Sequence, residues 1–471
     1  MNRYIIKGME KYLNEEHHPW HMPGHKRKNI SSDVNGKVDV AIDYAMYLDV
    51  TEVPGTDDLH HPEFMIKNSM EELKKIYGTY ASYYLINGST TGIHTAIAAC
   101  FDERKSNKTI IDYSTDDYDI IITSNCHKSV YNIIDLLNLK PFILEMNMIK
   151  DENLPRIHGA VSPESVEEIC SRINNVKAMV ITSPTYEGVV SDIKAIKDVL
   201  NKYDITLIVD EAHGAHLPFL KKCPESAIKL GADLVIQSLH KTLPSLTQTA
   251  ILHVNNELLN NKIKKYLSVF MSSSPSYMLL CSMEKAISWA HEQNHDKYIN
   301  ALTEFRKKTQ KFNYIDVLKK EQAVMAGVYD YDETRIVITT KNCRANIPGI
   351  FIERRINEIG SIVCEMSGID YVVLISSLVD KEDDFNHLYN VLYQLDKELA
   401  MSSNNIFESD SNLCDEEYEE KLRNMIGTKS KDNIYVYPPG AYIVKANEVI
   451  SKEKIDLLLE YKKSGKEIRG I

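Results

Sequence analysis

The sequence predicts an α/β protein with a mainly parallel β-sheet, followed by a smaller α+β region. Between about residues 80 and 255, short apolar runs alternate with amphipathic stretches, which is typical of repeated β-α-β units. Several of these runs are unbroken and rich in β-branched residues, as in strands buried on both faces of a sheet. After about residue 290 the alternation gives way to a charged helical pattern with fewer strands.

The strands of the first region are expected where the apolar runs fall. Eight runs qualify: Ser82–Ile86, Thr109–Ile111, Ile120–Thr123, Phe142–Leu144, Ala178–Thr182, Thr206–Asp210, Asp233–Gln237 and Ala250–Val254. Amphipathic helices are predicted between them, as at Ser162–Ile173 and Ile193–Tyr203. The first begins with Ser162-Pro163, an N-cap serine followed by proline at the first helical position. Ligands bind beyond the carboxyl ends of the strands in such sheets, so functional residues are expected where these runs end.

The flanking regions have a different character. Met1–Glu16 predicts an amphipathic helix, and Met401–Glu420 is polar and acidic, which is typical of a linker. Between them we expect a helix at Ala301–Gln322, strands at Thr334–Thr340 and Tyr371–Ser376, and a helix at Ile350–Ile359. These changes predict an N-terminal arm, a large domain, a small domain and a C-terminal segment, with boundaries at residues 1–50, 51–295, 296–400 and 401–471.

Composition excludes several classes of protein. The net charge of −12 disfavours nucleic acids and anionic membranes as partners, because their phosphates would be repelled. The eight cysteines form no Cys-x-x-Cys pair, so neither a metal site nor a thioredoxin-type site is predicted, and free thiols fit a reducing cytosol. No apolar run approaches the ~18 residues of a membrane span. We therefore expect a cytoplasmic protein whose ligand is a small molecule.

Two polar groups follow separate apolar runs. Thr206–Val209 ends in Asp210, and Asp233–Gln237 is followed by Ser238-Leu239-His240-Lys241. A lysine in a partly desolvated cleft has a lowered pKa, which frees its neutral amine for Schiff-base chemistry. Asp210 and Lys241 lie about one β-α-β unit apart, so two neighbouring strands would present them to one ligand. Considered alone, Asp210 would be a helix N-cap and Lys241 a solvated surface lysine.

A third element is the stretch Asn87–Gly92 (NGSTTG), which follows the first predicted strand. Backbone N–H groups at a helix N-terminus bind anions, although a plain capped turn has the same composition. His127 follows another strand and either stacks on a flat ligand or lies exposed in a loop. Pyridoxal phosphate (PLP) needs this combination: an amine for its aldehyde, a carboxylate for its ring nitrogen, and donors for its phosphate.

The chain resembles the short bacterial Orn/Lys/Arg decarboxylases, which are fold-type-I PLP enzymes, and within them the arginine decarboxylases. The matching stretches follow the family's order and cover nearly the whole chain. They are HMPGHK from His21, DVTEVPGTDDL from Asp49, NGST from Asn87, CHKSV from Cys126, DEAH from Asp210, QSLHKTLPSLTQ from Gln237, SPSY from Ser274 and YPPG from Tyr437.

The resemblance implies a fold-type-I large domain with a mainly parallel seven-stranded sheet, plus smaller α+β C-terminal domains. It implies that Lys241 is the Schiff-base lysine and that Asp210 pairs with the protonated ring nitrogen. Ala212 would pack on the ring face and His127 would stack on the ring and help to deliver a proton. His213 would lie near the phenolic oxygen of PLP or the substrate carboxylate.

The resemblance also implies phosphate ligands and a homodimer or larger homo-oligomer. The phosphate ligands would be Ser89, Thr90, Ser238 and His240, and Ser273 or Ser274 would reach the phosphate bound by a partner subunit. The implied reaction converts a basic L-amino acid into an amine and CO2, with arginine as first choice and then lysine or ornithine.

A cationic side chain needs carboxylates to recognise it. The candidates are Glu448, which the family favours, Glu365 and Asp57; each alone is more often a surface carboxylate. The sequence departs from the family pattern at Phe64, Glu187, Ala441-Tyr442 and Lys445-Ala446-Asn447, which bears on the substrate and leaves the cofactor residues intact.

Two alternatives stay open at this point. One is a PLP aminotransferase or lyase on the same fold, which needs an arginine to hold the substrate carboxylate, such as Arg335 or Arg344. The other is a PLP-binding protein without decarboxylase activity.

Overall fold

The computed structural model describes residues 1–15, 45–102, 117–146, 148–149, 151, 154–343, 347–401, 416–437, 441–445, 447–464 and 466–471. The matched stretch that begins at His21 and the predicted strand Thr109–Ile111 lie outside these residues. None of the described helices combines the length and the apolar character of a membrane span.

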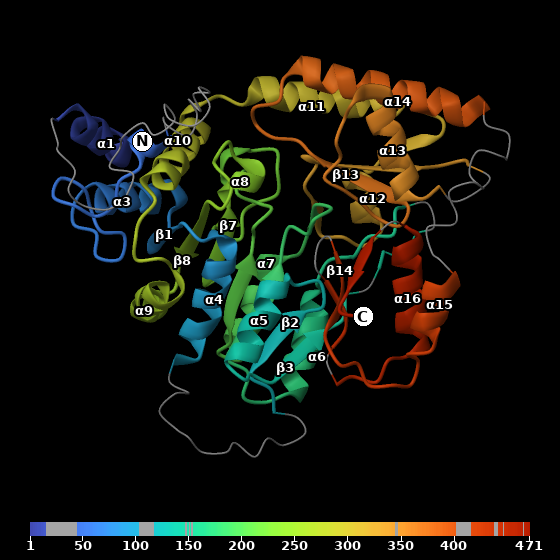
Figure 1. The fold of residues 1–471 in the computed structure, drawn as a ribbon, viewed down its shortest axis with the longest axis horizontal. Helices are drawn as coiled ribbons and strands as arrows, with labels where there is room; N and C mark the ends of the chain where they lie inside the picture. The colour runs from blue at the N-terminus through green and yellow to red at the C-terminus, as the bar shows by residue number, and fades with distance from the viewer. Residues whose placement is uncertain are drawn as a thin grey trace, which may run out of the picture.

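A seven-stranded sheet forms the centre of the molecule (Figure 1). Its strands lie in the order β1-β8-β7-β6-β4-β2-β3, with parallel pairing from β7 to β3 and with β8 antiparallel to both neighbours. The mainly parallel sheet was therefore predicted correctly, as were the seven predicted strands that lie in described residues. The strands are β1 (Ala81–Leu85), β2 (Ile120–Thr123), β3 (Pro141–Leu144), β4 (Ala178–Thr182), β6 (Thr206–Asp210), β7 (Leu234–Ser238) and β8 (Ala250–Val254).

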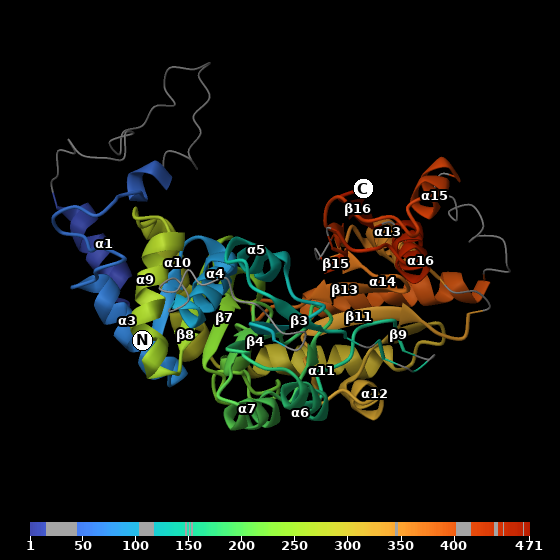
Figure 2. The ribbon, with the colours of Figure 1, turned by 90° about the horizontal axis from the view of Figure 1, so that it is seen from below.

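Helices cover both faces of this sheet: α4 and α5 lie on one face and α6 and α7 on the other (Figure 2). Strands β2, β7 and β8 are buried along their whole length, as expected between two helical layers. Ser162 caps α6 as predicted, because its Oγ accepts the Ser165 N–H at 3.1 Å. The helices are α3 (Met65–Tyr77), α4 (Gly88–Cys100), α5 (Lys128–Leu136), α6 (Pro163–Arg172), α7 (Ile193–Lys202), α8 (Leu239–Thr242), α9 (Asn260–Phe270) and α10 (Tyr277–Glu292).

The predicted N-terminal helix is α1 (Tyr4–Asn14), which packs on α3 and α10. The buried Glu284 carboxylate accepts the Ile5 and Ile6 N–H groups at 3.1 and 2.9 Å and the Ser69 hydroxyl at 2.6 Å. One carboxylate of α10 therefore satisfies the open backbone donors in the first turn of α1.

A four-stranded sheet follows, in the order β12-β13-β11-β9, with all its pairs antiparallel. The predicted strands β11 and β13 and the predicted helix α13 are present, and β10 (Asp330–Tyr331) pairs with β5 (Val189–Val190). The elements are β9 (Ile315–Val317), β11 (Arg335–Thr340), β12 (Met366–Ser367), β13 (Tyr371–Ile375), α11 (Asp296–Thr309), α12 (Lys320–Met325), α13 (Gly349–Gly360) and α14 (Glu382–Met401).

The prediction of one helix over Ala301–Gln322 was wrong. Helix α11 ends at Thr309, β9 intervenes, and α12 begins at Lys320. The Asp396 carboxylate of α14 accepts three consecutive N–H groups, those of Asn313, Tyr314 and Ile315, at 3.2, 2.7 and 2.9 Å. The interior of a helix cannot offer three consecutive N–H groups to one side chain, because they bond to carbonyls one turn earlier, so the distant aspartate stabilises the start of the strand instead.

The C-terminal part is a three-stranded sheet, in the order β15-β14-β16, packed with α15 and α16 around its own apolar cluster. The predicted linker or exposed connection over Met401–Glu420 begins where α14 ends, at Met401, but its last residues belong to α15, which begins at Glu416; residues 402–415 lie outside the described part. The elements are α15 (Glu416–Arg423), β14 (Ile434–Tyr437), β15 (Ala441–Val444), α16 (Lys452–Lys463) and β16 (Glu467–Arg469). The bounds of the four predicted segments stay predictions.

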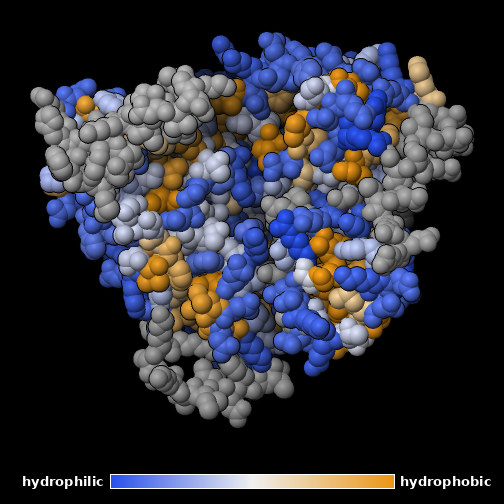
Figure 3. Space-filling model, in the orientation of Figure 1, coloured by the Kyte–Doolittle hydropathy of each residue, from blue (hydrophilic) through white to orange (hydrophobic). Residues whose placement is uncertain are grey.

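Figure 3 shows one face of the molecule, on which hydrophobic residues lie in small groups among hydrophilic ones.

Candidate active site

The predicted site residues come from one edge of the large sheet. Asp210 ends β6 and pairs in register with Thr182 at the end of β4. Ser238 ends β7, and Lys241 follows it within α8. His127 lies beyond β2 and caps α5, and Ser89 lies in the first turn of α4, beyond β1. Because these strand ends meet at the same edge, segments far apart in sequence meet there.

The Lys241 amine lies next to an imidazole. Its Nζ is 3.0 Å from Nε2 of His213, and burial lowers the pKa of Lys241, against the opposing field of Asp210. Burial also holds the pKa of His213 well below its usual range, and the nearby Lys241 and Arg335 charges add to this effect. The pair therefore combines a neutral imidazole with an amine that loses its proton more readily than a surface lysine does.

Asp210 is buried and supplies the negative charge of the site. Its Oδ1 accepts the Ala212 N–H at 3.1 Å. Burial lowers the pKa of His127, and the Asp210 charge opposes this effect. The Nδ1 of His127 is bonded to Ser129, with the Ser129 Oγ at 2.8 Å, which orients the imidazole from outside the site.

The predicted phosphate loop has the geometry of an anion site only in part. Gly88, with φ of +77°, begins α4, and the Ser238 hydroxyl donates to the Ser89 hydroxyl at 3.0 Å. Thr90 is exposed in the same turn. His240 is bonded through Nδ1 to the Thr249 carbonyl, at 3.0 Å. The two serines meet as expected, and the phosphate roles of Thr90 and His240 stay predictions.

The predicted inter-subunit segment lies beside this loop. The Asn87 Oδ1 accepts the Ser272 N–H at 3.1 Å. Ser273 and Ser274 are exposed, and their predicted reach to a partner's phosphate stays a prediction.

A cavity of about 260 Å³ joins these groups. One set of lining residues, called here the sheet group, comes from the strand ends and the loops that follow them: Ser89, Asn125, Cys126, His127, Thr182, Asp210, Ala212, His213 and Lys241. A second set, called here the outer group, comes from the β4–β5 loop, the four-stranded sheet and the C-terminal part: Glu187, Tyr371, Tyr461 and Lys466.

The sheet group fits PLP. Two of its buried polar atoms, Asn125 Oδ1 and His213 Nδ1, have no hydrogen-bond partner within the described residues, so they remain available to a ligand. Lys241 offers an amine, Asp210 a carboxylate, and the Ser89 turn a hydroxyl with backbone donors. These are the complements of an aldehyde, a ring nitrogen and a phosphate.

Two of the three predicted substrate carboxylates, Glu448 and Asp57, lie elsewhere. Glu448 is not in the cavity lining; it accepts the Lys445 N–H at 2.9 Å and pairs with Lys454. Asp57 is buried and accepts the N–H groups of Glu63, Phe64 and Ile66, each at 2.9 Å, so it organises the start of α3. The substrate role of Glu448 stays a prediction.

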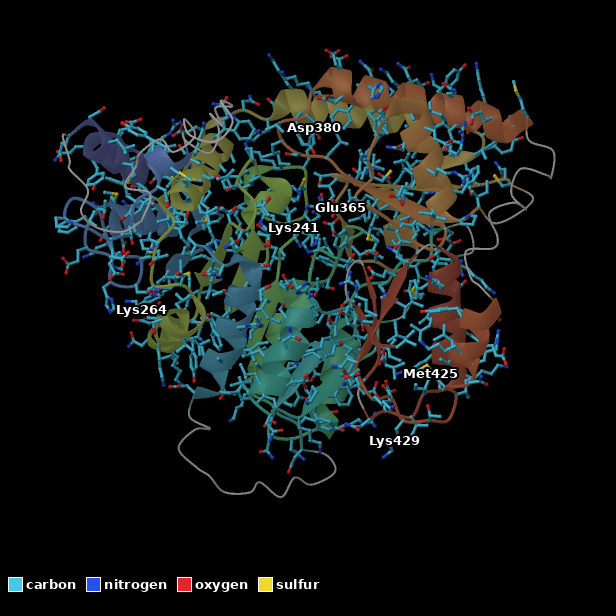
Figure 4. The ribbon with its side chains drawn as sticks, in the orientation of Figure 1. Lys241, Lys264, Glu365, Asp380, Met425 and Lys429 are labelled. Atoms are coloured by element: carbon cyan, nitrogen blue, oxygen red, sulfur yellow. The ribbon has the colours of Figure 1, made fainter. Side chains whose placement is uncertain are left out.

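Glu365 is exposed but lies close to the reactive amine. It accepts the hydroxyl of Tyr186, a cavity residue, and its charge raises the pKa of Lys241. Figure 4 shows Lys241 and Glu365 near each other at the centre of the molecule. Glu365 thus contacts the cavity wall, and its substrate role stays a prediction.

Sequence reasoning missed the aromatic wall of the site. The Tyr186 ring lies 4.4 Å from the His213 ring, between centroids, and 5.9 Å from the Lys241 Nζ. Tyr186 and Glu187 follow β4, so the strand-end rule applied to Asp210 and Lys241 would also have found them. Tyr371, Tyr461 and Lys466 carry no such signal, because only tertiary packing brings them to the cavity.

Arg335 does not occupy the position that an aminotransferase would need. It is completely buried, donates to the His213 carbonyl at 2.6 Å, and is not among the cavity residues. Its hydrogen bond holds the His213 backbone carbonyl in place. Arg344 lies outside the described residues.

The chain is similar to known proteins over nearly its whole length. Residues 4–332 match the family model described as Orn/Lys/Arg decarboxylase, major domain. The arginine decarboxylase of Bacillus subtilis is 25% identical, covering 99% of this chain and 95% of that protein. The arginine decarboxylase of Halalkalibacterium halodurans is 27% identical, covering 97% and 93%. A Bacillus subtilis protein named "Uncharacterized protein YaaO" is 28% identical, covering 97% and 94%.

Among solved structures, the Francisella novicida lysine decarboxylase LdcF shares the fold. The two superpose with a TM-score of 0.77 at 18% identity, covering 100% of this chain and 79% of that one. The family match spans well over half of the chain and includes the sheet group. The chain therefore belongs to the Orn/Lys/Arg decarboxylase family.

Proposed function

We propose that this protein is a PLP-dependent decarboxylase that converts a basic L-amino acid into the corresponding amine and CO2. The observation that carries the proposal is the pairing of a buried carboxylate, Asp210, with a desolvated amine, Lys241, in one cavity of a chain from this family. Arginine is the first candidate substrate, followed by lysine and ornithine. The relatives that match nearly the whole chain include arginine decarboxylases.

The residues of the sheet group would divide the work of holding PLP. Lys241 would bind its aldehyde covalently, Asp210 would keep its ring nitrogen protonated, and Ser89, supported by Ser238, would bind its phosphate. His127 and Ala212 would contact the ring. When bound, PLP supplies an electron sink that accepts the electron pair released as CO2 departs.

Side chains of the protein would accept and donate the protons that the reaction needs. With its pKa held low, His213 is a neutral acceptor 3.0 Å from the Lys241 amine. A substrate enters as an ammonium ion and would have to lose a proton before its nitrogen could react, and the neutral His213 imidazole would accept that proton. Lys241, once free, or His127 would return a proton to the substrate carbon that lost its carboxylate.

The loss of a carboxylate is favoured where a charge is poorly solvated. Arg335 donates to the His213 carbonyl and is not among the residues that line the cavity. An aminotransferase instead needs a cation to retain the carboxylate. Arg335 does not provide that cation, and the product assay decides between the two reactions.

A product assay tests the proposal. Purified protein with PLP is incubated with arginine, lysine and ornithine, and CO2, amines and keto acids are quantified. We expect CO2 and one amine in equal amounts from at least one substrate. Keto acid without CO2, or no product from any of the three, would overturn the proposal.

We also propose a homodimer or larger assembly in the cytosol. Ser273 and Ser274 are exposed beside the Asn87 turn, where a second subunit could use them. The seven cysteines in the described part of the chain are all free thiols, which fits a reducing compartment. Light scattering of the active enzyme tests the assembly, and an active monomer would contradict it.

A further inference from the structure

The outer group places a charged pair inside the cavity. Glu187 and Lys466 both line it, and both are almost fully buried, with 7% and 5% of their surfaces exposed. Glu187 lies in the β4–β5 loop, whereas Lys466 lies just before β16. Burying a charge is costly unless a partner compensates it, so this pair needs an explanation.

Glu187 is held in place by two hydroxyl groups. Its Oε1 accepts the Tyr371 hydroxyl at 2.7 Å and its Oε2 accepts the Thr185 hydroxyl at 3.0 Å. Both donors are neutral, so they orient the carboxylate and leave its charge uncompensated. Glu187 directly follows Tyr186, whose ring is 5.9 Å from the Lys241 Nζ. Glu187 and Lys241 line the same cavity, so a basic side chain bound beside Lys241 shares that cavity with the Glu187 carboxylate.

The Lys466 ammonium lies within the electrostatic field of this carboxylate. Burial lowers the pKa of Lys466 to about 8, and Glu187 is the first of two carboxylates, with Glu353, that oppose the change. Arg156 also lines the cavity, but its guanidinium pairs with Asp370, at 3.1 Å, and with Glu460. Lys466 is therefore a poorly solvated ammonium that lies within the field of the Glu187 carboxylate.

The other candidate carboxylates are less suited to a ligand in this cavity. Glu448 is paired with Lys454 outside the lining, and Glu365 is exposed to water. A carboxylate that is buried, already oriented and inside the cavity gives the strongest contact to a cation.

We propose that Glu187 binds the cationic end of the substrate side chain, and that the Lys466 ammonium competes with the substrate for this carboxylate. The inference rests on the proposed function for the identity of the substrate. Recognition of the substrate's cationic group is thus assigned to Glu187, a position where this sequence departs from its family's pattern. Without substrate, the Lys466 ammonium would occupy the place of the substrate's positive charge.

Binding to a non-reacting enzyme tests this inference separately from catalysis. Borohydride reduction of the PLP-loaded protein fixes the cofactor to the enzyme, so that substrates bind without reacting. Dissociation constants are then measured calorimetrically for arginine, lysine and ornithine, and for the neutral analogues citrulline and norleucine. The quantity compared is the preference for the best cationic ligand over its neutral analogue.

Four variants separate the roles. Glu187→Gln should reduce the preference about 10- to 100-fold, the size of a charge-assisted hydrogen bond. Glu187→Asp retains the charge and should retain most of the preference, which shows that a loss in the Gln variant is not misfolding. Lys466→Met should tighten cation binding by about threefold or more, as removal of a competing ion predicts. Glu467→Gln, on the exposed side of the same segment, is the matched control and should behave as wild type.

The outcomes are distinct. An unchanged preference in Glu187→Gln, a loss in Glu448→Gln instead, or weaker cation binding in Lys466→Met would each overturn the inference. If the unreduced enzyme releases no CO2 from any basic amino acid while Glu187→Gln still abolishes the binding preference, the proposed function fails and the inference stands.

Discussion

Two lysines line the same cavity, and their surroundings differ. Lys241 follows β7 and lies 3.0 Å from His213, within the field of Asp210. Lys466 precedes β16 and lies within the field of Glu187. Burial lowers the pKa of both, so a lowered pKa alone does not identify the lysine that binds a cofactor. The surroundings do: Lys241 has a carboxylate and a hydroxyl-rich helix start around it, and Lys466 has a carboxylate and two tyrosines.

The comparison separates the chemistry of the site from its selectivity. The sheet group is assembled at one edge of one sheet, where strands of neighbouring β-α-β units end. The outer group is assembled from three distant parts of the chain. We therefore expect changes in the sheet group to reduce turnover, and changes in the outer group to alter which substrate is preferred.

The largest effect is expected from Lys241→Ala. Losing the amine removes both the covalent link to PLP and a proton donor, so kcat should fall by about 10³-fold or more. Lys466→Met should retain turnover within about tenfold, because the expected change is in binding alone. The measurement is kcat for both variants with saturating PLP. An equal fall of kcat in the two variants would contradict the different roles proposed for the two lysines.

The next effect is expected from Asp210→Asn. The amide keeps the shape of the side chain but removes the charge that holds the ring nitrogen protonated, so kcat should fall about 10²-fold. The affinity for PLP, followed by its absorbance, should change less than kcat. Turnover close to that of wild type would show that Asp210 does not have this role.

A smaller effect, confined to substrate binding, is expected from Tyr371→Phe. The variant loses the hydroxyl that donates to Glu187 at 2.7 Å, so the carboxylate is less well oriented. We predict that KM for the cationic substrate rises about tenfold with little change in kcat. Steady-state kinetics test this. A fall in kcat at constant KM would show that Tyr371 acts in turnover and not in substrate binding.

The smallest effect on activity is expected from Glu211→Gln, although the residue adjoins Asp210. Glu211 points away from the cavity and accepts groups from Ser226, Ala227 and Gln237, at 2.6–2.7 Å. Burial raises the pKa of Glu211 from 4.5 to about 7. The folded protein thus retains a proton that the unfolded chain loses above pH 4.5.

This contribution to stability is complete below pH 4.5 and is lost as the pH rises towards 7, at about 1 kcal/mol per pH unit. The Gln variant cannot titrate, so its free energy of unfolding should lack this slope. Denaturant titrations at pH 5, 6, 7 and 8 compare the two proteins. Parallel pH profiles for wild type and variant would contradict the raised pKa.

The sequence was sufficient for the sheet and for the residues at its edge. Buried parallel strands have unbroken apolar runs, and polar residues that follow such runs lie at the edge of the sheet where the strands end. This is why Asp210, Lys241 and His127 could be found from the sequence. The specific cofactor came from the family resemblance, because a lysine and an aspartate after two strands suit several ligands.

The sequence was insufficient where structure depends on distant side chains. The helix predicted over Ala301–Gln322 is interrupted because Asp396, on another helix, captures three N–H groups of the chain. Lys466 and Tyr371 reach the cavity only through the packing of the smaller sheets. Glu187 was visible as a departure from the family pattern, but its burial and its hydroxyl donors were not.

The most direct test of the account is to find which lysine carries the cofactor. The PLP-loaded protein is reduced with borohydride, digested, and mapped by mass spectrometry for the lysine bearing the pyridoxyl group. We predict modification at Lys241 and none at Lys466, although both amines line the same cavity and both have lowered pKa values. A pyridoxyl group on Lys466, or on any lysine other than Lys241, would contradict it.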